Sequence, residues 1–321
     1  MTGSASPAPA PLTRPARLRP GSPVAVVSPS GPCDPGLVAE GTRILAGWGL
    51  DVRTGPHALA RHPSISYLAG ADEDRAADLE RAWLDPEIGA VLCSRGGYGA
   101  QRMVDRLDWT AMAASAPKIF AGFSDVTALH EAFALRLGLA TLHSPTIGGD
   151  GFIQHPEAQQ ALRQALFTPD APGGRTLHSD GTPWLVPGRA TGRTAGGNLS
   201  MLVTNLATPD GRDSAAGFAG CILLLEDVNE ECYRLDRMLT QLLRSGALDG
   251  VAGIALGTWT GCLPADGVRP VLAGRLAGLG VPVACGFGFG HVAPQPVIPL
   301  GVPAGLDSAA GTLTFFQPAV S

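Results

Sequence analysis

The stretch Lys118-Ile-Phe-Ala-Gly-Phe-Ser-Asp-Val-Thr-Ala-Leu-His130 joins an apolar run to a helical pattern through a single serine. The run ends in Gly122 and Ser124 follows. Apolar residues then recur at helical spacing, namely Val126, Leu129, Phe133 and Leu137. This order predicts a strand, a sharp turn and a helix, with the hydroxyl of Ser124 pushed out of the fold at the apex. A helix N-terminus favours negative charge, so the stretch is typical of a nucleophilic serine, and a plain helix N-cap is the alternative.

Strand-like and helical segments alternate on both sides of this stretch. Short β-rich runs are expected at 24–28, 50–53, 88–93 and 139–142, most of them followed by a helical pattern. Such alternation predicts an α/β domain with a parallel sheet covered on both faces. Farther along, the buried run 221–226 and short β segments near the end, separated by Gly and Pro turns, indicate a mixed, β-rich second domain.

These patterns divide the chain into four parts. We expect a disordered Ala/Pro-rich tail at 1–20 and an N-terminal α/β domain carrying the serine at 21–150. Pro, Gly and Asp are frequent at 151–188, which we interpret as a linker or crossover with one helix. The remainder, 189–321, is the predicted β-rich C-terminal domain.

Composition excludes several classes of protein. The 321 residues are 45% hydrophobic and 16% charged, with a formal net charge of −5 and no basic block, so neither nucleic acid nor a membrane surface is an expected partner. The six cysteines form no C-x-x-C pair, which favours buried thiols in a reducing compartment over disulfides or a zinc site. The tail has no apolar core segment typical of a signal peptide, and no run reaches transmembrane length. We therefore expect a cytoplasmic globular protein.

Two further residues stand where chemistry is expected. Glu226 ends the apolar run 222–225, and Asp227 competes with it for any functional role. His291 lies in the glycine-dense segment Cys285-Gly-Phe-Gly-Phe-Gly-His291, where close backbone approach is possible, although most histidines are structural. Serine, acid and histidine can form a nucleophile, an orienting carboxylate and a general base. Ser124, Glu226 and His291 are therefore a candidate triad that would assemble across two domains.

A second glycine-rich segment, Arg95-Gly-Gly-Tyr-Gly99, follows the run 88–93. It is either a tight strand-to-helix turn or an anion cradle made of backbone N–H groups. In a serine hydrolase it would supply half of an oxyanion hole, with the N–H of Asp125 as the other half. It lacks G-K-[ST] and G-x-G-x-x-G, so neither a P-loop nor a dinucleotide site is predicted. No H-x-x-x-H spacing supports a zinc hydrolase.

Taken together, several motifs resemble the LD-carboxypeptidases, the muramoyltetrapeptide carboxypeptidases grouped with microcin self-immunity peptidases. The resemblance covers roughly residues 20–318, in the family's order. The motifs are Ser28-Pro-Ser-Gly, Ser94-Arg-Gly-Gly-Tyr-Gly, Gly122-Phe-Ser-Asp-Val-Thr, His143-Ser-Pro, Gly196-Gly-Asn-Leu-Ser, Leu225-Glu-Asp-Val, Tyr233-Arg-Leu-Asp-Arg and Gly290-His-Val. The Ala/Pro tail is not part of the family pattern.

The resemblance implies a flavodoxin-like N-terminal domain, a smaller β-rich C-terminal domain and a homodimer. It also implies no metal or cofactor, and a Ser124–His291–Glu226 triad that removes the terminal D-alanine from murein tetrapeptides in peptidoglycan recycling. Within that mechanism we assign the oxyanion donors to Gly97 and Asp125. Arg95 and Arg234 are the candidates for binding the substrate carboxylate, because arginine binds a carboxylate in a bidentate manner.

Two rival functions remain open. A self-immunity peptidase would keep the mechanism and cleave peptidyl or aminoacyl adenylates, with an aromatic residue such as Trp184 against the base. A protein of another class would bind an anionic ligand on the Arg95 segment without catalysis. The presence of all three triad residues argues against that second rival.

Overall fold

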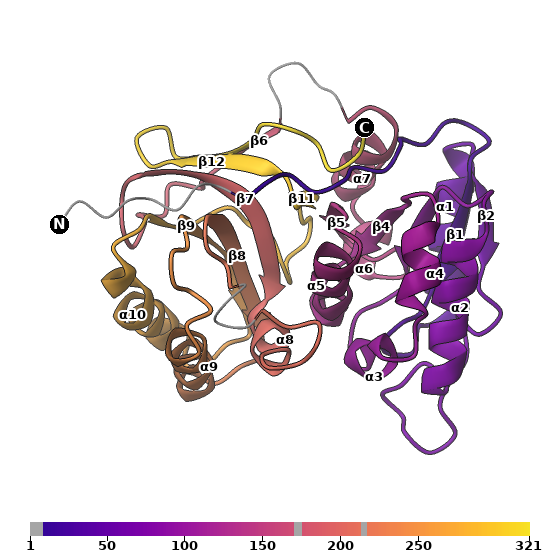
Figure 1. Cartoon of the computed structure of the whole chain (residues 1–321), viewed down its shortest axis with the longest axis horizontal. Helices are drawn as coiled ribbons and strands as arrows, with labels where there is room; N and C mark the ends of the chain where they lie inside the picture. The colour runs from indigo at the N-terminus through magenta and orange to yellow at the C-terminus, as the bar shows by residue number, and fades with distance from the viewer. Residues whose placement is uncertain (1–8, 170–174, 213–216) are drawn as a thin grey trace. The chain divides into compact units, whose positions relative to one another are not determined.

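The structure is a computed structural model of the chain, and it describes residues 9–169, 175–212 and 217–321. The described residues form two compact units, each built around its own sheet (Figure 1). The N-terminal unit comprises Leu12–Asp170 and two later returns of the chain, Ala293–Pro299 and Pro318–Ser321. The rest of the described chain makes up the C-terminal unit.

The sheet of the N-terminal unit has six strands in the order β11-β5-β4-β3-β1-β2. Their bounds are β1 (Pro23–Val27), β2 (Asp51–Thr54), β3 (Ala90–Cys93), β4 (Ile119–Gly122), β5 (Thr141–His143) and β11 (Ile298–Leu300). The pairs β2–β1, β1–β3, β3–β4 and β4–β5 are all parallel. This 2-1-3-4-5 order is that of flavodoxin-like folds, and it confirms the predicted α/β class.

Two groups of helices pack in this unit. They are α1 (Pro35–Gly47), α2 (Asp72–Leu84), α3 (Ala100–Val104), α4 (Trp109–Ala114), α5 (Thr127–Arg136), α6 (Asp150–Ile153) and α7 (Pro156–Phe167). One group comprises α1, α6 and α7, and the other comprises α2 to α5, because contacts link the helices within each group. Local signals fix their starts: the Asp34 carboxylate accepts from the Gly36 and Leu37 amides ahead of α1, and α2 begins with three acidic residues that suit the helix dipole.

The expected disordered tail needs correction where the structure describes it. The Thr13 amide donates to the Gly138 carbonyl at 2.7 Å, and Leu18, only 3% exposed, donates to the Leu166 carbonyl at 2.9 Å. The end of the chain returns to the same segment, since the Ser321 amide donates to the Pro15 carbonyl. These contacts give residues 13–18 apolar burial and backbone partners, which an Ala/Pro composition does not reveal. Residues 1–8 of the tail lie outside the described residues.

The segment 151–188, interpreted as a linker or crossover, contributes structure to both units. It includes most of α6, all of α7 and the strand β6 (Arg175–His178), while residues 170–174 lie outside the described part. β6 pairs antiparallel with β13 (Thr312–Phe315), so it is an edge strand of the second sheet. Its partner lies about 135 residues farther along the chain, which is why no local signal indicated it.

The C-terminal unit has a mixed seven-stranded sheet in the order β10-β9-β8-β7-β12-β13-β6. The remaining strands are β7 (Arg189–Asn198), β8 (Cys221–Val228), β9 (Gly253–Thr260), β10 (Val283–Ala284) and β12 (Pro303–Asp307). β7 to β10 pair in parallel, and β7, β12, β13 and β6 pair antiparallel. The unit also contains α8 (Leu199–Thr204), α9 (Cys232–Arg244) and α10 (Ala265–Leu276).

The apolar core of this unit follows the expected periodicities. The strand β8 is buried along nearly its whole length, as expected for a central parallel strand. The helix α9 turns Leu235, Leu239 and Leu242 into the core at helical spacing. None of the helices within the described ranges is long and apolar enough to cross a membrane.

Candidate active site

Ser124 occupies a strained turn between β4 and α5. β4 ends at Gly122, a 3₁₀ turn spans Ser124–Val126, and α5 follows at Thr127. The φ of Ser124 is +69°, in the left-handed region that costs a residue with a Cβ roughly 1–2 kcal/mol. Such strain at the apex of a strand-to-helix turn is typical of a nucleophile elbow.

His130 holds the backbone that precedes this turn. Its Nε2 lies 3.0 Å from the Gly122 carbonyl oxygen and its Nδ1 lies 2.9 Å from Oγ1 of Thr141. A carbonyl can only accept, so Nε2 carries the proton and Nδ1 accepts from the threonine hydroxyl. Burial lowers the pKa of His130 to about 4, so the ring is neutral at physiological pH. His130 therefore has a structural role.

Gly96 lies directly against Ser124, and Gly97 lies against Gly31. A Cβ built on Gly96 would stand 2.8 Å from Cβ and 3.2 Å from Oγ of Ser124, so no other residue fits there without a shift. The Gly96 carbonyl accepts from the Gly31 amide at 3.0 Å, and Gly97 has a φ of +109°. The glycine-rich segment thus packs directly on the turn that carries Ser124.

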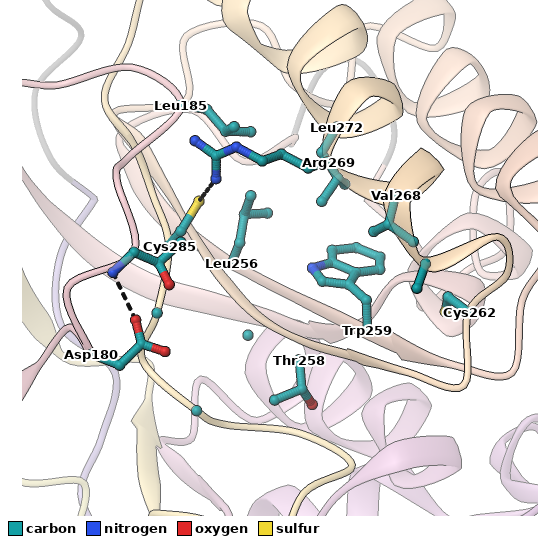
Figure 2. Close-up of a pocket in the computed structure, with 15 residues that line it drawn as sticks. Asp180, Leu185, Leu256, Thr258, Trp259, Cys262, Val268, Arg269, Leu272 and Cys285 are labelled. Atoms are coloured by element: carbon teal, nitrogen blue, oxygen red, sulfur yellow. Dashed lines mark hydrogen bonds between the residues drawn. The ribbon is translucent and has the colours of Figure 1, made fainter.

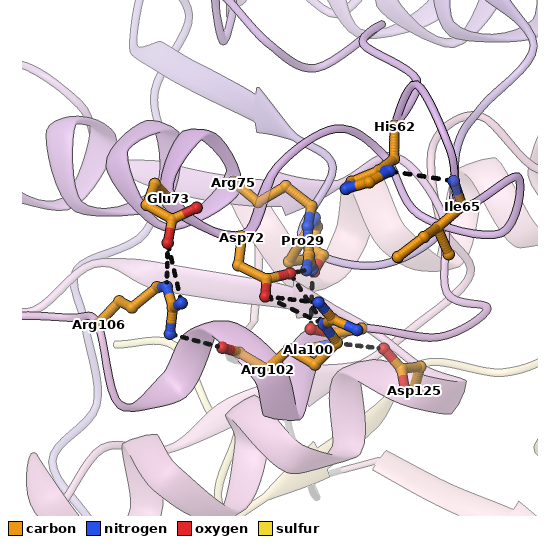
Figure 3. Close-up of polar contacts among 11 residues, drawn as sticks. Pro29, His62, Ile65, Asp72, Glu73, Arg75, Ala100, Arg102, Arg106 and Asp125 are labelled. Atoms are coloured by element: carbon orange, nitrogen blue, oxygen red, sulfur yellow. Dashed lines mark hydrogen bonds and ion pairs between the residues drawn. The ribbon is translucent and has the colours of Figure 1, made fainter.

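A buried ionic network fixes the loops on this side of the sheet (Figure 3). Arg75, only 2% exposed, donates from Nη1 to the carbonyls of Pro29 and Gly99, the latter at 2.8 Å, and pairs with Asp72. Asp72 also accepts from Nε of Arg102 at 3.0 Å. Because Pro29 and Gly99 belong to the loops after β1 and β3, one guanidinium ties both loops together.

The side chain of Asp125 belongs to the same network. Its Oδ2 accepts from the Ala100 amide at 2.8 Å, at the start of α3, and Figure 3 shows this contact beside Arg75. Burial raises the pKa of Asp125, while the hydrogen bond from the Ala100 amide and the charge of Arg75 oppose that rise. The carboxylate therefore anchors the end of the glycine-rich segment, and its own N–H follows Ser124 at the turn.

Glu226 and His291 meet in the C-terminal unit. Glu226 is fully buried near the end of β8, and its Oε2 lies 2.6 Å from Nδ1 of His291. An ionised carboxylate can only accept, so Nδ1 carries the proton and Nε2 offers the lone pair of a base. Gly290 makes this pairing possible: its φ is +106°, and a Cβ there would stand 2.6 Å from Oε2 of Glu226.

Asp227, the competing acid, is committed elsewhere. Its Oδ1 accepts from Nδ2 of Asn198 at 3.0 Å, and its Oδ2 accepts from the amide and hydroxyl of Ser200 at 3.0 and 2.7 Å. These bonds attach the start of α8 to the end of β8. The geometry therefore leaves Glu226 as the carboxylate that faces the histidine.

The two candidate arginines differ in how far they are engaged. Arg95 is exposed and donates from Nη1 to the Pro32 carbonyl at 2.7 Å. Arg234 forms an ion pair with Glu230 at 2.5 Å, one helical turn away.

Cys93 is fully buried and burial raises the pKa of its thiol, which agrees with a core role. Trp184 packs edge-on against Phe287, with ring centroids 6.1 Å apart.

The structure thus brings the predicted residues together in two sets. Ser124 and Asp125 share one turn in the N-terminal unit, beside the loop of Gly96 and Gly97, and Glu226 and His291 share a hydrogen bond in the C-terminal unit. Sequence reasoning missed Arg75. The signal that could have revealed it is its position on the buried side of α2, one turn after Asp72. Within the described residues, no cluster of three or more His, Cys, Asp or Glu side chains is arranged to hold a metal ion.

Two family models match the chain. The model of the LD-carboxypeptidase N-terminal domain matches residues 24–144, and that of the LD-carboxypeptidase C-terminal domain matches residues 191–306. A Streptomyces coelicolor protein, provisionally named a carboxypeptidase, is 57% identical over 309 residues, spanning 96% of this chain and 98% of the relative. The murein tetrapeptide carboxypeptidase of Pseudomonas aeruginosa is 34% identical over 291 residues, spanning 88% and 92%.

Solved structures share the fold. A crystal structure of a muramoyltetrapeptide carboxypeptidase from Oxalobacter formigenes has a TM-score of 0.76 at 26% identity, covering 91% of this chain and 97% of that one. The microcin C7 self-immunity protein MccF, solved with aspartyl sulfamoyl adenosine, has a TM-score of 0.81 at 22% identity, covering 96% and 100%. The similarity to MccF shows a shared fold alone.

Proposed function

The chain belongs to the LD-carboxypeptidase family and is a carboxypeptidase, and from this premise we propose that it removes the terminal D-alanine from murein tetrapeptides by a serine mechanism. The observation that carries the proposal is the 2.6 Å hydrogen bond between Glu226 and His291, which supports the histidine as the base. It is supported by the strained turn at Ser124 in the other unit. The proposal also includes the cytoplasmic recycling role and the homodimer of the family.

Ser124 is the proposed nucleophile. Its Oγ attacks the carbonyl carbon that precedes D-alanine, and Nε2 of His291 takes the hydroxyl proton as the new C–O bond forms. The proposal requires these two atoms to come within about 3 Å during catalysis. Glu226 keeps the proton on Nδ1, so that Nε2 is the basic nitrogen, and stabilises the imidazolium that results.

The N–H groups of Gly97 and Asp125 are the proposed oxyanion donors. They stabilise the negative charge on the carbonyl oxygen of the tetrahedral intermediate, and one such donor is worth about 10²–10³-fold in rate. The intermediate collapses when the C–N bond breaks and His291 returns its proton to the amine of D-alanine. A water molecule, activated by His291, then hydrolyses the acyl-enzyme ester and regenerates Ser124.

Arg95 is the stronger of the two proposed contacts to the substrate carboxylate. Arg95 donates one N–H to the Pro32 carbonyl, whereas Arg234 already has a carboxylate partner in Glu230. Guanidinium presents five donors in a fork that matches a carboxylate. Amidation of the terminal D-alanine is therefore expected to slow cleavage sharply, because the amide cannot form the ion pair.

The test is a comparison of four substrates with the wild-type enzyme. We expect release of D-alanine from L-Ala-D-Glu-meso-diaminopimelate-D-Ala, and little from the pentapeptide, whose last bond joins two D-residues. The nucleophile and oxyanion donors address one face of the carbonyl, and a misplacement of about 1 Å can cost 10²-fold. The amidated tetrapeptide and an aminoacyl sulfamoyl-adenosine complete the set.

Each outcome has a defined meaning. Equal cleavage of tetrapeptide and pentapeptide would refute the L,D assignment, and preference for the adenosine compound would favour a self-immunity function. No turnover of any of the four would contradict the proposed substrate class.

A further inference from the structure

A pocket of about 360 Å³ lies wholly within the C-terminal unit, beside the end of β9 and the first turns of α10 (Figure 2). Its walls are mostly apolar and include Leu185, Leu256, Val268 and Leu272. The volume falls in the range of small-molecule sites, which combine apolar walls with a few polar groups. Neither Glu226 nor His291 lines this pocket, so it is distinct from the proposed catalytic pair.

Two buried polar atoms on its walls lack hydrogen-bond partners in the described part of the chain, Oγ1 of Thr258 and Nε1 of Trp259. Thr258 lies in a bulge and Trp259 follows it, because Leu225 pairs with Leu256 whereas Asp227 pairs with Trp259, which leaves two residues of β9 opposite one of β8. Figure 2 shows the indole ring along one wall with its nitrogen toward the interior. An indole N–H can only donate, so a ligand with an acceptor would satisfy it.

Two opposite charges stand on another side of the pocket. Arg269 donates to the Pro183 carbonyl at 2.8 Å and contacts Sγ of Cys285 at 3.9 Å, and it forms no ion pair with any described residue. Asp180 accepts from the Thr182 amide at 2.9 Å, and hydrogen bonds from the hydroxyl and the amide of Thr182 lower the pKa of its carboxyl; it likewise has no cationic partner among those residues. In Figure 2 both side chains flank Cys285.

We propose that this pocket binds a free α-amino acid whose side chain is apolar along its length and ends in a hydrogen-bond acceptor. The carboxylate of the ligand pairs with Arg269 and its ammonium group with Asp180. The side chain crosses the apolar walls and its terminal acceptor receives the N–H of Trp259. Tyrosine and methionine have this form, whereas phenylalanine and norleucine match them in shape and lack an equivalent acceptor.

The test is isothermal titration calorimetry of the full-length protein with these four amino acids, each as the L and D form. We expect saturable binding of tyrosine or methionine in at least one form, and weaker binding of phenylalanine and norleucine. Ser124→Ala should bind equally well, because the pocket does not depend on the proposed catalysis. A failure of the catalytic proposal therefore leaves this test intact.

Variants identify the site. Arg269→Gln and Asp180→Asn should each weaken binding about tenfold or more, because each leaves a ligand charge without its partner. Trp259→Phe should remove the preference of tyrosine over phenylalanine. Arg275→Gln is the matched control, since it removes an arginine of the same helix that pairs with Asp236 outside the pocket, and it should change nothing.

Three results would overturn the proposal. They are the absence of saturable binding by any of the amino acids, affinity unchanged in both charge variants, and equal binding by N-acetyl-tyrosine, which lacks the ammonium group. Ala265→Phe adds a ring at the exposed mouth of the pocket and should block binding without altering the core.

Discussion

Nδ1 of His291 lies 2.6 Å from Oε2 of Glu226, and this bond joins residues that are 65 positions apart in the chain. The glutamate is fully buried and the histidine side chain is 19% exposed. The carboxylate is thus shielded from water, while part of the histidine side chain is exposed. A buried acid that orients a partly exposed histidine is the arrangement that the proposed mechanism requires.

Replacing Ser124 should separate activity from stability. We expect Ser124→Ala to lower turnover by about 10⁴-fold or more if the triad acts as a unit. Ser124→Gly should be equally inactive but more stable than Ser124→Ala by roughly 1 kcal/mol, because glycine adopts φ +69° without strain. Turnover assays and chemical denaturation of both variants check this. Near-normal turnover in folded Ser124→Ala would end the serine mechanism.

Gly290 should tolerate no side chain. In Gly290→Ala the new Cβ would press on Oε2 of Glu226 and displace the carboxylate from His291, so we expect at least a ~10²-fold loss of turnover. The matched control is Gly288→Ala, which has a similar positive φ of +58° and nothing within 4 Å of the added atom. It should keep most of its activity. Equal losses of turnover in both variants would indicate that backbone strain alone causes the effect.

Arg75 should matter for stability and for turnover. Arg75→Leu leaves the carbonyls of Pro29 and Gly99 without their donor and Asp72 without one partner, and we expect a loss of about 3 kcal/mol in unfolding free energy. Arg106→Leu, which breaks an exposed pair with Glu73, should cost far less, because solvent screens that pair. Denaturation of both variants measures the difference.

Arg75→Lys tests the positioning role of this network. Lysine keeps the charge but cannot span both carbonyls in the same fork, so we expect kcat to fall while KM changes little. An unchanged kcat in folded Arg75→Lys would contradict a role for the network in placing the glycine-rich segment.

His130 should make the fold sensitive to acid. Its folded-state pKa of about 4 lies below the value of 6.5 expected for an unfolded histidine, so the unfolded chain binds the proton more readily. The contribution of this group to stability is full above pH ~6.5 and is lost as the pH falls toward 4, by roughly 3 kcal/mol in all. His130→Asn cannot titrate, so its stability should fall less steeply than that of the wild type across this window. Parallel pH profiles would refute the assignment.

Much of the N-terminal unit could be predicted from local patterns. The acidic run Asp72-Glu-Asp74 is a local signal for the start of a helix, and the structure has α2 at Asp72–Leu84. The apolar runs also indicated β1, β3 and β4 to within about two residues, because each is a short buried strand of a parallel sheet. The strand, turn and helix around Ser124 followed from the same local spacing.

The surroundings of the site were harder to predict from the sequence. The triad assignment itself stays a prediction, but the choice between Glu226 and Asp227 illustrates the difficulty. Both residues end the same strand and carry the same group, so composition and spacing cannot separate them. Only the register of β8 with its neighbours and the partners at Asn198, Ser200 and His291 do so.

The sequence by itself determined most of the strands and helices of the N-terminal unit, and it determined that a serine stands at the sharp turn after β4. These depend on side-chain periodicity and on residues within one or two turns of each other. The tertiary structure alone decided that His291 faces Glu226, that Arg75 ties two loops, and that the segment around Thr13 packs beside Gly138. Hydrogen-bond partners far apart in the chain are chosen by strand order and burial, which no local pattern encodes.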